Sequence, residues 1–307
     1  MDPYIPELHE PQPANRGPVV RVVLLTVVVG LAGMCILKPQ AVRAAIEEIE
    51  TILALKSTPV PASPAKFSDH LAGQLEAMTP QGQAELLLEE SVNHYAGAIE
   101  MIEPRLDSWR GVLQLTPRLS QLLDTAMNSN DLRVRAAALE IYLDAYNIHK
   151  NSLSVSTLEQ RVADEPGARP WALWMLGALG NRGVEPIGVL REELNYVNDP
   201  DERTRSWAVQ GLAILGTDLA IEPLLDSFRN DPSPTVRERA ACGLAQSGMF
   251  TQAQRMTAVP RLLDFAEDPT LDAQTRGWVF QALQDITGAN LGPDTQAWRR
   301  WWNEHHS

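Results

Sequence analysis

The fold of this chain is decided by the stretch Asp231-Pro-Ser-Pro-Thr-Val-Arg-Glu-Arg-Ala-Ala-Cys-Gly-Leu-Ala-Gln-Ser-Gly248. It begins with an Asp-Pro turn, continues through small and apolar residues at helical spacing, and ends in glycine. When Arg237 is taken as position zero, the residues at positions +3, +4 and +7 share one face of a helix. The closing glycine is typical of a left-handed C-terminal cap.

The same pattern recurs along the chain. The arginines at position zero are Arg135, Arg169, Arg205, Arg237 and Arg276, separated by 34, 36, 32 and 39 residues. A second series, Pro186, Pro223 and Pro260, begins apolar helical runs ahead of three of these copies, since proline fits the first turn of a helix. Each unit is therefore predicted to contain a helix A, a turn and a helix B. A helix pair repeated every 30–45 residues or so predicts an all-α solenoid.

This pattern, Asp-Pro…Val-Arg-x-x-Ala-Ala-x-x-Leu…Gly, resembles the HEAT repeats, and among them the PBS-lyase HEAT-like group. The resemblance covers about residues 116–288 in five units. The unit at about 153–181 departs most, because its helix A is short and lacks the proline. The family includes scaffolds and lyase-like proteins, so the resemblance implies an architecture more specifically than a function. It also implies that the B helices line the concave side of the solenoid.

The N-terminal part of the chain predicts a membrane anchor. Residues 1–17 are polar and contain prolines, as in a disordered tail. Residues 18–38 are predicted to form a transmembrane helix, because Val22 to Leu37 contains no charge and Arg21 can snorkel. A cleaved signal peptide is the alternative, but the apolar run is longer than such peptides usually carry and no Ala-x-Ala site follows closely. We expect a single-pass cell-membrane protein.

The orientation of this anchor is not decided by charge. Arg16 and Arg21 flank one side, and Lys38 and Arg43 flank the other, so the positive-inside count is a tie. A short tail before the anchor favours a solenoid on the outer, periplasmic side. Residues 39–66 are predicted to form a juxtamembrane amphipathic helix followed by a proline-rich linker.

Residues 67–115 precede the repeats and do not match them. Apolar residues there alternate spacings of four and three, as in a heptad seam. They are Leu88, Val92, Tyr95, Ile99, Ile102, Leu106, Trp109 and Leu113. One interpretation is an N-terminal helical cap on the solenoid, which Pro104 favours because it would break a long helix. The other is a homodimer through a coiled coil at Leu88–Leu113.

The C-terminal residues 289–307 are predicted to close the solenoid with one helix. Pro293 opens it, and Trp298, Trp301 and Trp302 lie on one face at i, i+3 and i+4. We expect this face to pack on the last repeat. A position at a membrane interface is the minor alternative for these indoles.

Composition limits the classes of partner. The net charge is −13, and residues 1–65 contribute only −1 of it, so the repeats are acidic. An acidic surface argues against binding to a nucleic-acid backbone. The two cysteines, Cys35 and Cys242, form neither a disulfide framework nor a zinc pattern. We expect no nucleic-acid partner, no metal and no cofactor.

The sequence also lacks a recognisable catalytic motif. It contains no phosphate-binding glycine loop, no His-Glu-x-x-His and no Ser-His-Asp context. The repeated Asp and Arg residues are better explained by turn capping and by a hydrogen-bond ladder between units than by a reaction site. We therefore expect that the protein is not an enzyme.

One pattern does suggest a binding surface. At positions +2 and +5, which point away from the apolar face of each helix B, indoles recur. The candidate protein-binding residues are Trp171, Trp174, Trp207, Arg239 and Trp278. Exposed aromatic residues favour interfaces. The competing interpretation is that each indole packs against the neighbouring unit.

These features predict a membrane-anchored scaffold that binds another protein through its repeat surface. A basic or amphiphilic partner would suit the acidic field of the repeats. The alternative is a lyase-like protein that handles a tetrapyrrole. It is implied only by the resemblance to the PBS-lyase HEAT-like group, and no residue supports it independently.

Overall fold

The structure, a computed structural model, describes residues 69–306. The predicted tail (1–17), transmembrane helix (18–38) and juxtamembrane segment (39–66) lie outside these residues. Within 69–306, none of the helices combines the length and the apolar composition needed to cross a bilayer.

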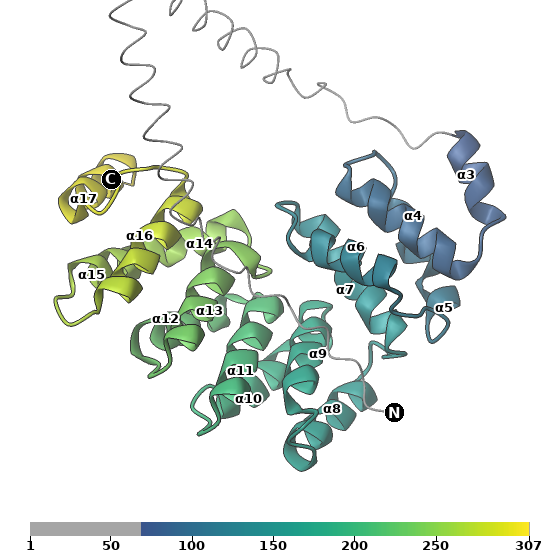
Figure 1. Ribbon diagram of the computed structural model, residues 1–307, viewed down its shortest axis with the longest axis horizontal. Helices are drawn as coiled ribbons and strands as arrows, with labels where there is room; N and C mark the ends of the chain where they lie inside the picture. Colours follow the sequence, from purple (N-terminus) through teal and green to yellow (C-terminus); the bar gives the residue numbers. More distant parts are fainter. Residues whose placement is uncertain (1–68, 307) are drawn as a thin grey trace, which may run out of the picture. The chain divides into compact units, whose positions relative to one another are not determined.

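The described residues form helices and loops without a β-strand (Figure 1). The α-helices are α3 (Asp69–Glu76), α4 (Pro80–Val92), α5 (Leu106–Trp109), α6 (Pro117–Met127), α7 (Leu132–Ala145), α8 (Ser152–Asp164), α9 (Arg169–Asn181), α10 (Pro186–Tyr196), α11 (Glu202–Leu215), α12 (Ile221–Asn230), α13 (Pro234–Cys242), α14 (Gln252–Thr257), α15 (Val259–Glu267), α16 (Ala273–Thr287) and α17 (Thr295–His305). Short 3-10 helices η1 (Ile99–Met101), η2 (Glu103–Arg105) and η3 (Asp218–Ala220) and a π-helix η4 (Gly243–Ser247) complete the set. An all-α class is confirmed, and the paired helices are consistent with a solenoid.

Four helix pairs stack in the predicted manner: α8–α9, α10–α11, α12–α13 and α15–α16. Their B helices run parallel, as two contacts show in which the C-terminal end of one B helix meets the C-terminal end of the next. Asn181 at the end of α9 donates to the carbonyl of Leu215 at the end of α11. Gln246, just after α13, donates likewise to Asp285 of α16. The core between the pairs contains the predicted apolar face, with Leu176, Leu212, Leu244 and Leu283 at position +7 fully buried.

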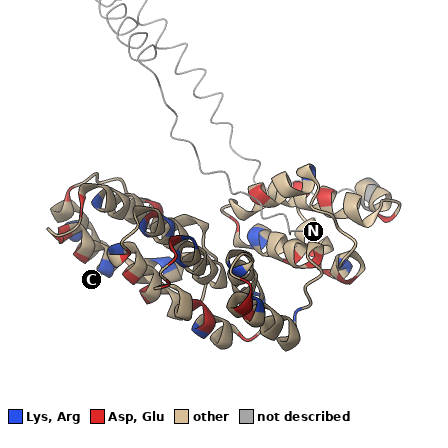
Figure 2. Cartoon of the chain, turned by 60° about the horizontal axis from the view of Figure 1, so that its bottom comes forward, with Lys and Arg blue, Asp and Glu red and all other residues tan. Residues whose placement is uncertain are grey.

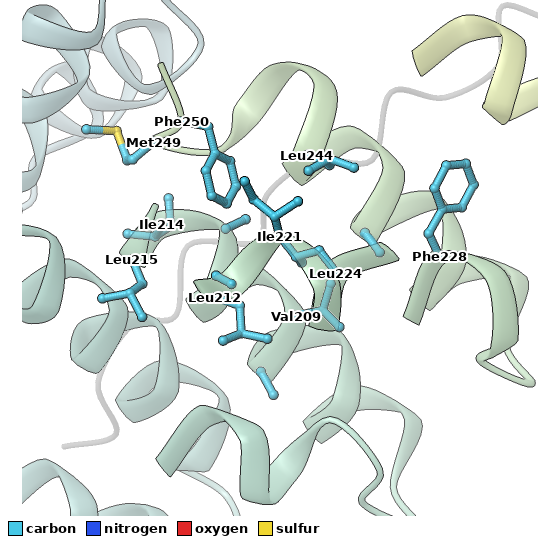
Figure 3. Packing of buried hydrophobic residues seen from close by; sticks show 14 of the residues in the cluster. Val209, Leu212, Ile214, Leu215, Ile221, Leu224, Phe228, Leu244, Met249 and Phe250 are labelled. Carbon is cyan, nitrogen blue, oxygen red and sulfur yellow. The ribbon is translucent and has the colours of Figure 1, made fainter. Parts of the chain in front are cut away.

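Figure 3 shows this packing where α11 meets the pair α12–α13. Val209 and Leu212 of α11 lie in one apolar layer with Ile221 and Leu224 of α12, and Leu244 of η4 closes it. Each of these side chains is at most 5 % exposed. Burial of such aliphatic side chains contributes about 1.5–3 kcal/mol each, so the repeats are held together mainly by this layer.

The turns carry the predicted ladder of polar bonds. Arg205 makes a buried, two-pronged ion pair with Asp231, at 2.8 and 3.1 Å, and also donates to the carbonyl of Asp199 in its own turn. Arg237 repeats both contacts one unit later, with Asp272 at 3.2 Å and the carbonyl of Asp231. The repeated Arg residues at these turns are therefore structural.

The first pair, α6–α7, differs from the rest. Tyr146 at the end of α7 meets Trp171 at the start of α9, whereas Tyr142, one turn earlier in α7, meets Trp174, one turn later in α9. The two helices consequently run antiparallel. Arg135 at the start of α7 does not reach the next turn. It donates instead to the carbonyls of Gln246 and Gly248 after η4, at 2.6 and 3.0 Å. Residues 116–147 thus form a helix pair as predicted, but one that is inverted relative to the others.

The N-terminal helices form a cap rather than a long coil. Helix α4 ends at Val92, His94 adopts a left-handed backbone with φ of 59°, and Pro104 lies in the short helix η2. The continuous helix that the coiled-coil interpretation requires over Leu88–Leu113 is therefore absent. Its apolar residues Leu88, Ile102, Leu106, Trp109 and Leu113 are buried within the chain, in a second core cluster with α6 and α7.

Glycine lies at or near the end of four B helices, and at two of them it forms the left-handed cap expected of the repeat. Gly216 and Gly288 adopt left-handed conformations with φ of 65° and 74°. Gly180 remains helical, and a Cβ there would lie 2.5 Å from a methyl group of Leu215. Gly248 is extended after the π-helix, where a Cβ would lie 2.3 Å from the carbonyl oxygen of Gly243. At Gly248 the added Cβ would meet rigid backbone, so glycine is favoured there by close packing rather than by a cap, whereas at Gly180 it would meet the end of a leucine side chain.

The C-terminal helix α17 packs on α15 of the last repeat. Trp298 is 1 % exposed, and its indole N–H donates to the carbonyl of Gly292 at 2.9 Å. Arg299 forms ion pairs with Asp264 and Glu267 of α15. Trp301 and Trp302 are half-buried and stack on the rings of His305 and His306, respectively.

Candidate functional site

The predicted binding residues lie at positions +2 and +5 of the B helices. We call the set Trp171, Trp174, Trp207, Gln210, Arg239 and Trp278 the B-helix ridge. The first two are on α9, the next two on α11, Arg239 is on α13 and Trp278 is on α16. They do not share one environment, because α7 covers the beginning of the ridge.

The indoles of α9 are used inside the chain. Trp171 is only 7 % exposed, and its ring is 5.3 Å from that of Tyr146, with the guanidinium of Arg161 5.1 Å from its centre. Trp174 is half-buried and meets the ring of Tyr142 edge-on at 5.1 Å. For these two residues the structure favours the competing interpretation, in which the indoles pack against the neighbouring unit.

The next part of the ridge is open to solvent. An open hollow of about 400 Å³ lies between the N-terminal halves of α11 and α13. Its lining residues are Asp201, Glu202, Arg203, Ser206, Trp207, Thr235 and Arg239. Trp207 and Arg239 are half-buried, and Arg239 donates to the side-chain oxygen of Gln210 at 2.9 Å. The hollow thus places the indole of Trp207 beside the guanidinium of Arg239, which Gln210 holds.

The charges in this hollow are balanced. Asp201 caps α11 by accepting bonds from the backbone N–H and the hydroxyl of Thr204, both at 2.8 Å. These bonds lower the pKa of Asp201, so it stays ionised at neutral pH. Asp201 and Glu202 are matched by Arg203 and Arg239, which leaves no net formal charge. The lining contains neither a histidine nor a cysteine.

Trp278 is half-buried against the main core on α16 and does not line the hollow. The predicted set therefore separates into three groups: Trp171 and Trp174 under α7, Trp207 and Arg239 in the hollow, and Trp278 on the last repeat. A binding role remains a prediction for all of them.

Two buried features were not anticipated from the sequence. Arg255 of α14 donates to the carbonyls of Gln246 and Gly248, which Arg135 also bonds, and burial lowers the pKa of Arg255 to about 10. Glu193 of α10 is fully buried and neither carboxylate oxygen has a hydrogen-bond partner. Burial raises its pKa well above the usual value, with a further contribution from the nearby Glu192. Neither residue belongs to the repeat motif, so periodicity gave no signal for it.

The surface of the described residues is mixed in charge. Figure 2 shows acidic and basic positions interspersed along the helices. Within residues 69–306, no group of three or more His, Cys, Asp or Glu side chains is placed to hold a metal ion. Cys242 is an exposed thiol, with its sulfur 3.5 Å from the hydroxyl of Ser247.

Comparison with known proteins supports the repeat architecture. Residues 155–245 match the family model described as HEAT repeats. The match spans α8 to η4, which contain three of the four parallel helix pairs, and it begins after the inverted pair α6–α7. No curated protein matches the chain.

Proposed function

We propose that this chain is a non-enzymatic scaffold that binds another protein at the hollow between α11 and α13. The observation that supports this most directly is the half-buried Trp207 beside Arg239, on a HEAT-like stack that leaves this part of the ridge uncovered. Tryptophan and arginine contribute large shares of binding energy at protein interfaces. A rigid stack of helix pairs holds them at fixed spacing.

A photo-crosslinking amino acid at Thr235 tests this proposal, because Thr235 is exposed and lines the hollow. In the full chain in its native cells, we expect one discrete protein adduct that disappears when Trp207→Ala is added. The control position is Gln160, which is exposed on α8 and outside the hollow. The same adducts from both positions, or none from Thr235, would refute the proposal.

We further propose that residues 18–38 anchor the scaffold in the membrane and that the repeats lie on the outer, periplasmic side. The support is the uncharged run from Val22 to Leu37. The full chain is expected to remain with membranes during alkaline carbonate extraction, and deletion of residues 18–38 should release it. Protease added to intact cells with a permeabilised outer layer should digest the repeats. Protection of the repeats under those conditions would contradict the outer placement.

A further inference from the structure

The contact between α7 and α9 shows how this ridge accommodates a helix. α7 lies antiparallel to α9, with Tyr142 on Trp174 and Tyr146 on Trp171. Tyrosines four residues apart lie on one face of a helix, and so do indoles three residues apart. Both ring pairs meet edge to face, at 5.1 and 5.3 Å, which is a favourable geometry for aromatic rings.

The same positions one unit later have no such helix over them. Trp207 and Gln210 occupy on α11 the positions that Trp171 and Trp174 occupy on α9. There the surface opens into the hollow of about 400 Å³. The hollow is continuous with the surface that α7 already covers, since both lie on the +2 and +5 positions of consecutive B helices.

We propose that the partner segment bound in this hollow is an amphipathic helix with two aromatic residues four positions apart, lying antiparallel to α11 as α7 lies on α9. This inference rests on the proposed function and names the chemistry of its partner. One ring packs edge-on against Trp207, and the second lies over Gln210 and Arg239, where a guanidinium is placed for a cation–π contact.

The orientation of this helix also agrees with backbone electrostatics. An antiparallel helix brings its C-terminal end, which carries partial negative charge, to the N-terminal end of α11, which carries partial positive charge. Because Asp201 and Glu202 are balanced by Arg203 and Arg239, recognition is aromatic rather than charge-driven. Binding should therefore depend only weakly on salt.

A fluorescently labelled peptide with the sequence of residues 132–150, which contains α7, is the probe. Fluorescence anisotropy with the full chain should show saturable binding. The Tyr142→Ala/Tyr146→Ala form of the peptide should bind at least about tenfold more weakly, a loss of about 1.4 kcal/mol. Trp207→Ala in the protein should weaken binding by a similar factor, and so should Thr235→Arg, which blocks the hollow from an exposed position without disturbing the core.

The matched control is Trp301→Ala, another half-buried indole, on α17, which should leave the affinity unchanged. Two results would overturn the inference. One is that the peptide does not bind. The other is that the Trp207→Ala and Thr235→Arg variants bind it as tightly as the unaltered chain does. A loss with Trp174→Ala but not with Trp207→Ala would also overturn it, because the peptide would then be exchanging with α7. If the peptide does not bind but the crosslinker at Thr235 still gives its protein adduct, the partner is not such a helix. If the crosslinker at Thr235 gives no adduct in the otherwise unaltered chain, the proposed scaffold function itself is refuted.

Discussion

The joint between α7 and α9 and the joint between α9 and α11 differ in helix direction and in the residues that make the contact. Between α9 and α11, Gly177 and Gly211 let the two backbones touch, since a Cβ on Gly177 would lie 2.4 Å from the carbonyl oxygen of Gly211. Between α7 and α9, two tyrosines meet two indoles and the helices run antiparallel. Backbone contact requires small residues in register, whereas interlocked rings keep the helices further apart.

The positions that face each other explain the difference. In every parallel joint, position +8 of one B helix and position +6 of the next are small. The pairs are Gly177 and Gly211, Ala213 and Gly243, and Ala245 and Ala282. Between α7 and α9 the same positions hold Leu143 and Met175, both 1 % exposed. Two large side chains cannot occupy the space of two small ones, so parallel stacking is excluded there and α7 inverts.

The largest expected effect tests the aromatic joint. Trp171→Ala should lower the free energy of unfolding by about 3–5 kcal/mol, because a buried indole is removed and a cavity remains. Trp207→Ala, at the open hollow, should cost only about 1 kcal/mol. Chemical denaturation of the two variants measures both values. Equal losses would mean that Trp207 is as much a part of the core as Trp171.

The second prediction compares the two arginines at position zero. Arg205→Met should cost roughly 3 kcal/mol, because it leaves the carboxylate of Asp231 buried without its ion-pair partner. Arg135→Met should cost about 1–2 kcal/mol, since the carbonyls of Gln246 and Gly248 keep their bonds from Arg255 and only that of Ser129 loses its donor. Hydrogen exchange should then rise mainly in α4, α6 and α7 for Arg135→Met. A uniform rise along 69–306 would show that the inverted pair is not a separate folding unit.

The third prediction tests the parallel joint. Gly177→Ala should destabilise the chain by roughly 2–3 kcal/mol, because the added Cβ meets rigid backbone and the helices must separate. The control is Gly277→Ala on α16, where no atom lies within 4 Å of the added Cβ. That change should stabilise the chain by about 0.5–1 kcal/mol, as alanine does in a helix interior. Thermal melts of both variants check the sign of each effect.

The smallest effect concerns the pH dependence of the same joint. Glu193 packs against Gly211, and its pKa is raised by burial, so the folded state keeps a proton that the unfolded state has released. Stability therefore falls as the pH rises from the unfolded value toward the raised folded one. Glu193→Gln should remove this decline and stabilise the chain by on the order of 1 kcal/mol at pH 8, with no gain at pH 4. A gain that does not change with pH would show that Glu193 is ionised in the fold.

Much of the candidate site follows from the sequence, but not its division into parts. Counting from position zero places Trp171, Trp207 and Trp278 away from the apolar face of their helices, and the structure places them on the B helices as expected. Counting along the sequence does not reveal that α7 covers Trp171 and leaves Trp207 open. That difference depends on a contact between helices that begin 37 residues apart. Arg255 and Glu193 are not positions of the repeat motif, so only their burial in the structure marks them.

By itself, the sequence determined the helix pairs of the repeats and their turns, because these depend on local periodicity, proline positions and capping residues that each repeat carries. It also indicated a closing helix at the C-terminus, although of its three indoles only Trp298 is fully buried. Only the tertiary structure decided the direction in which each pair stacks and which part of the ridge stays open. Those properties depend on the volumes of side chains that meet from different repeats. Two small facing residues permit close parallel stacking of the B helices, and two large ones prevent it.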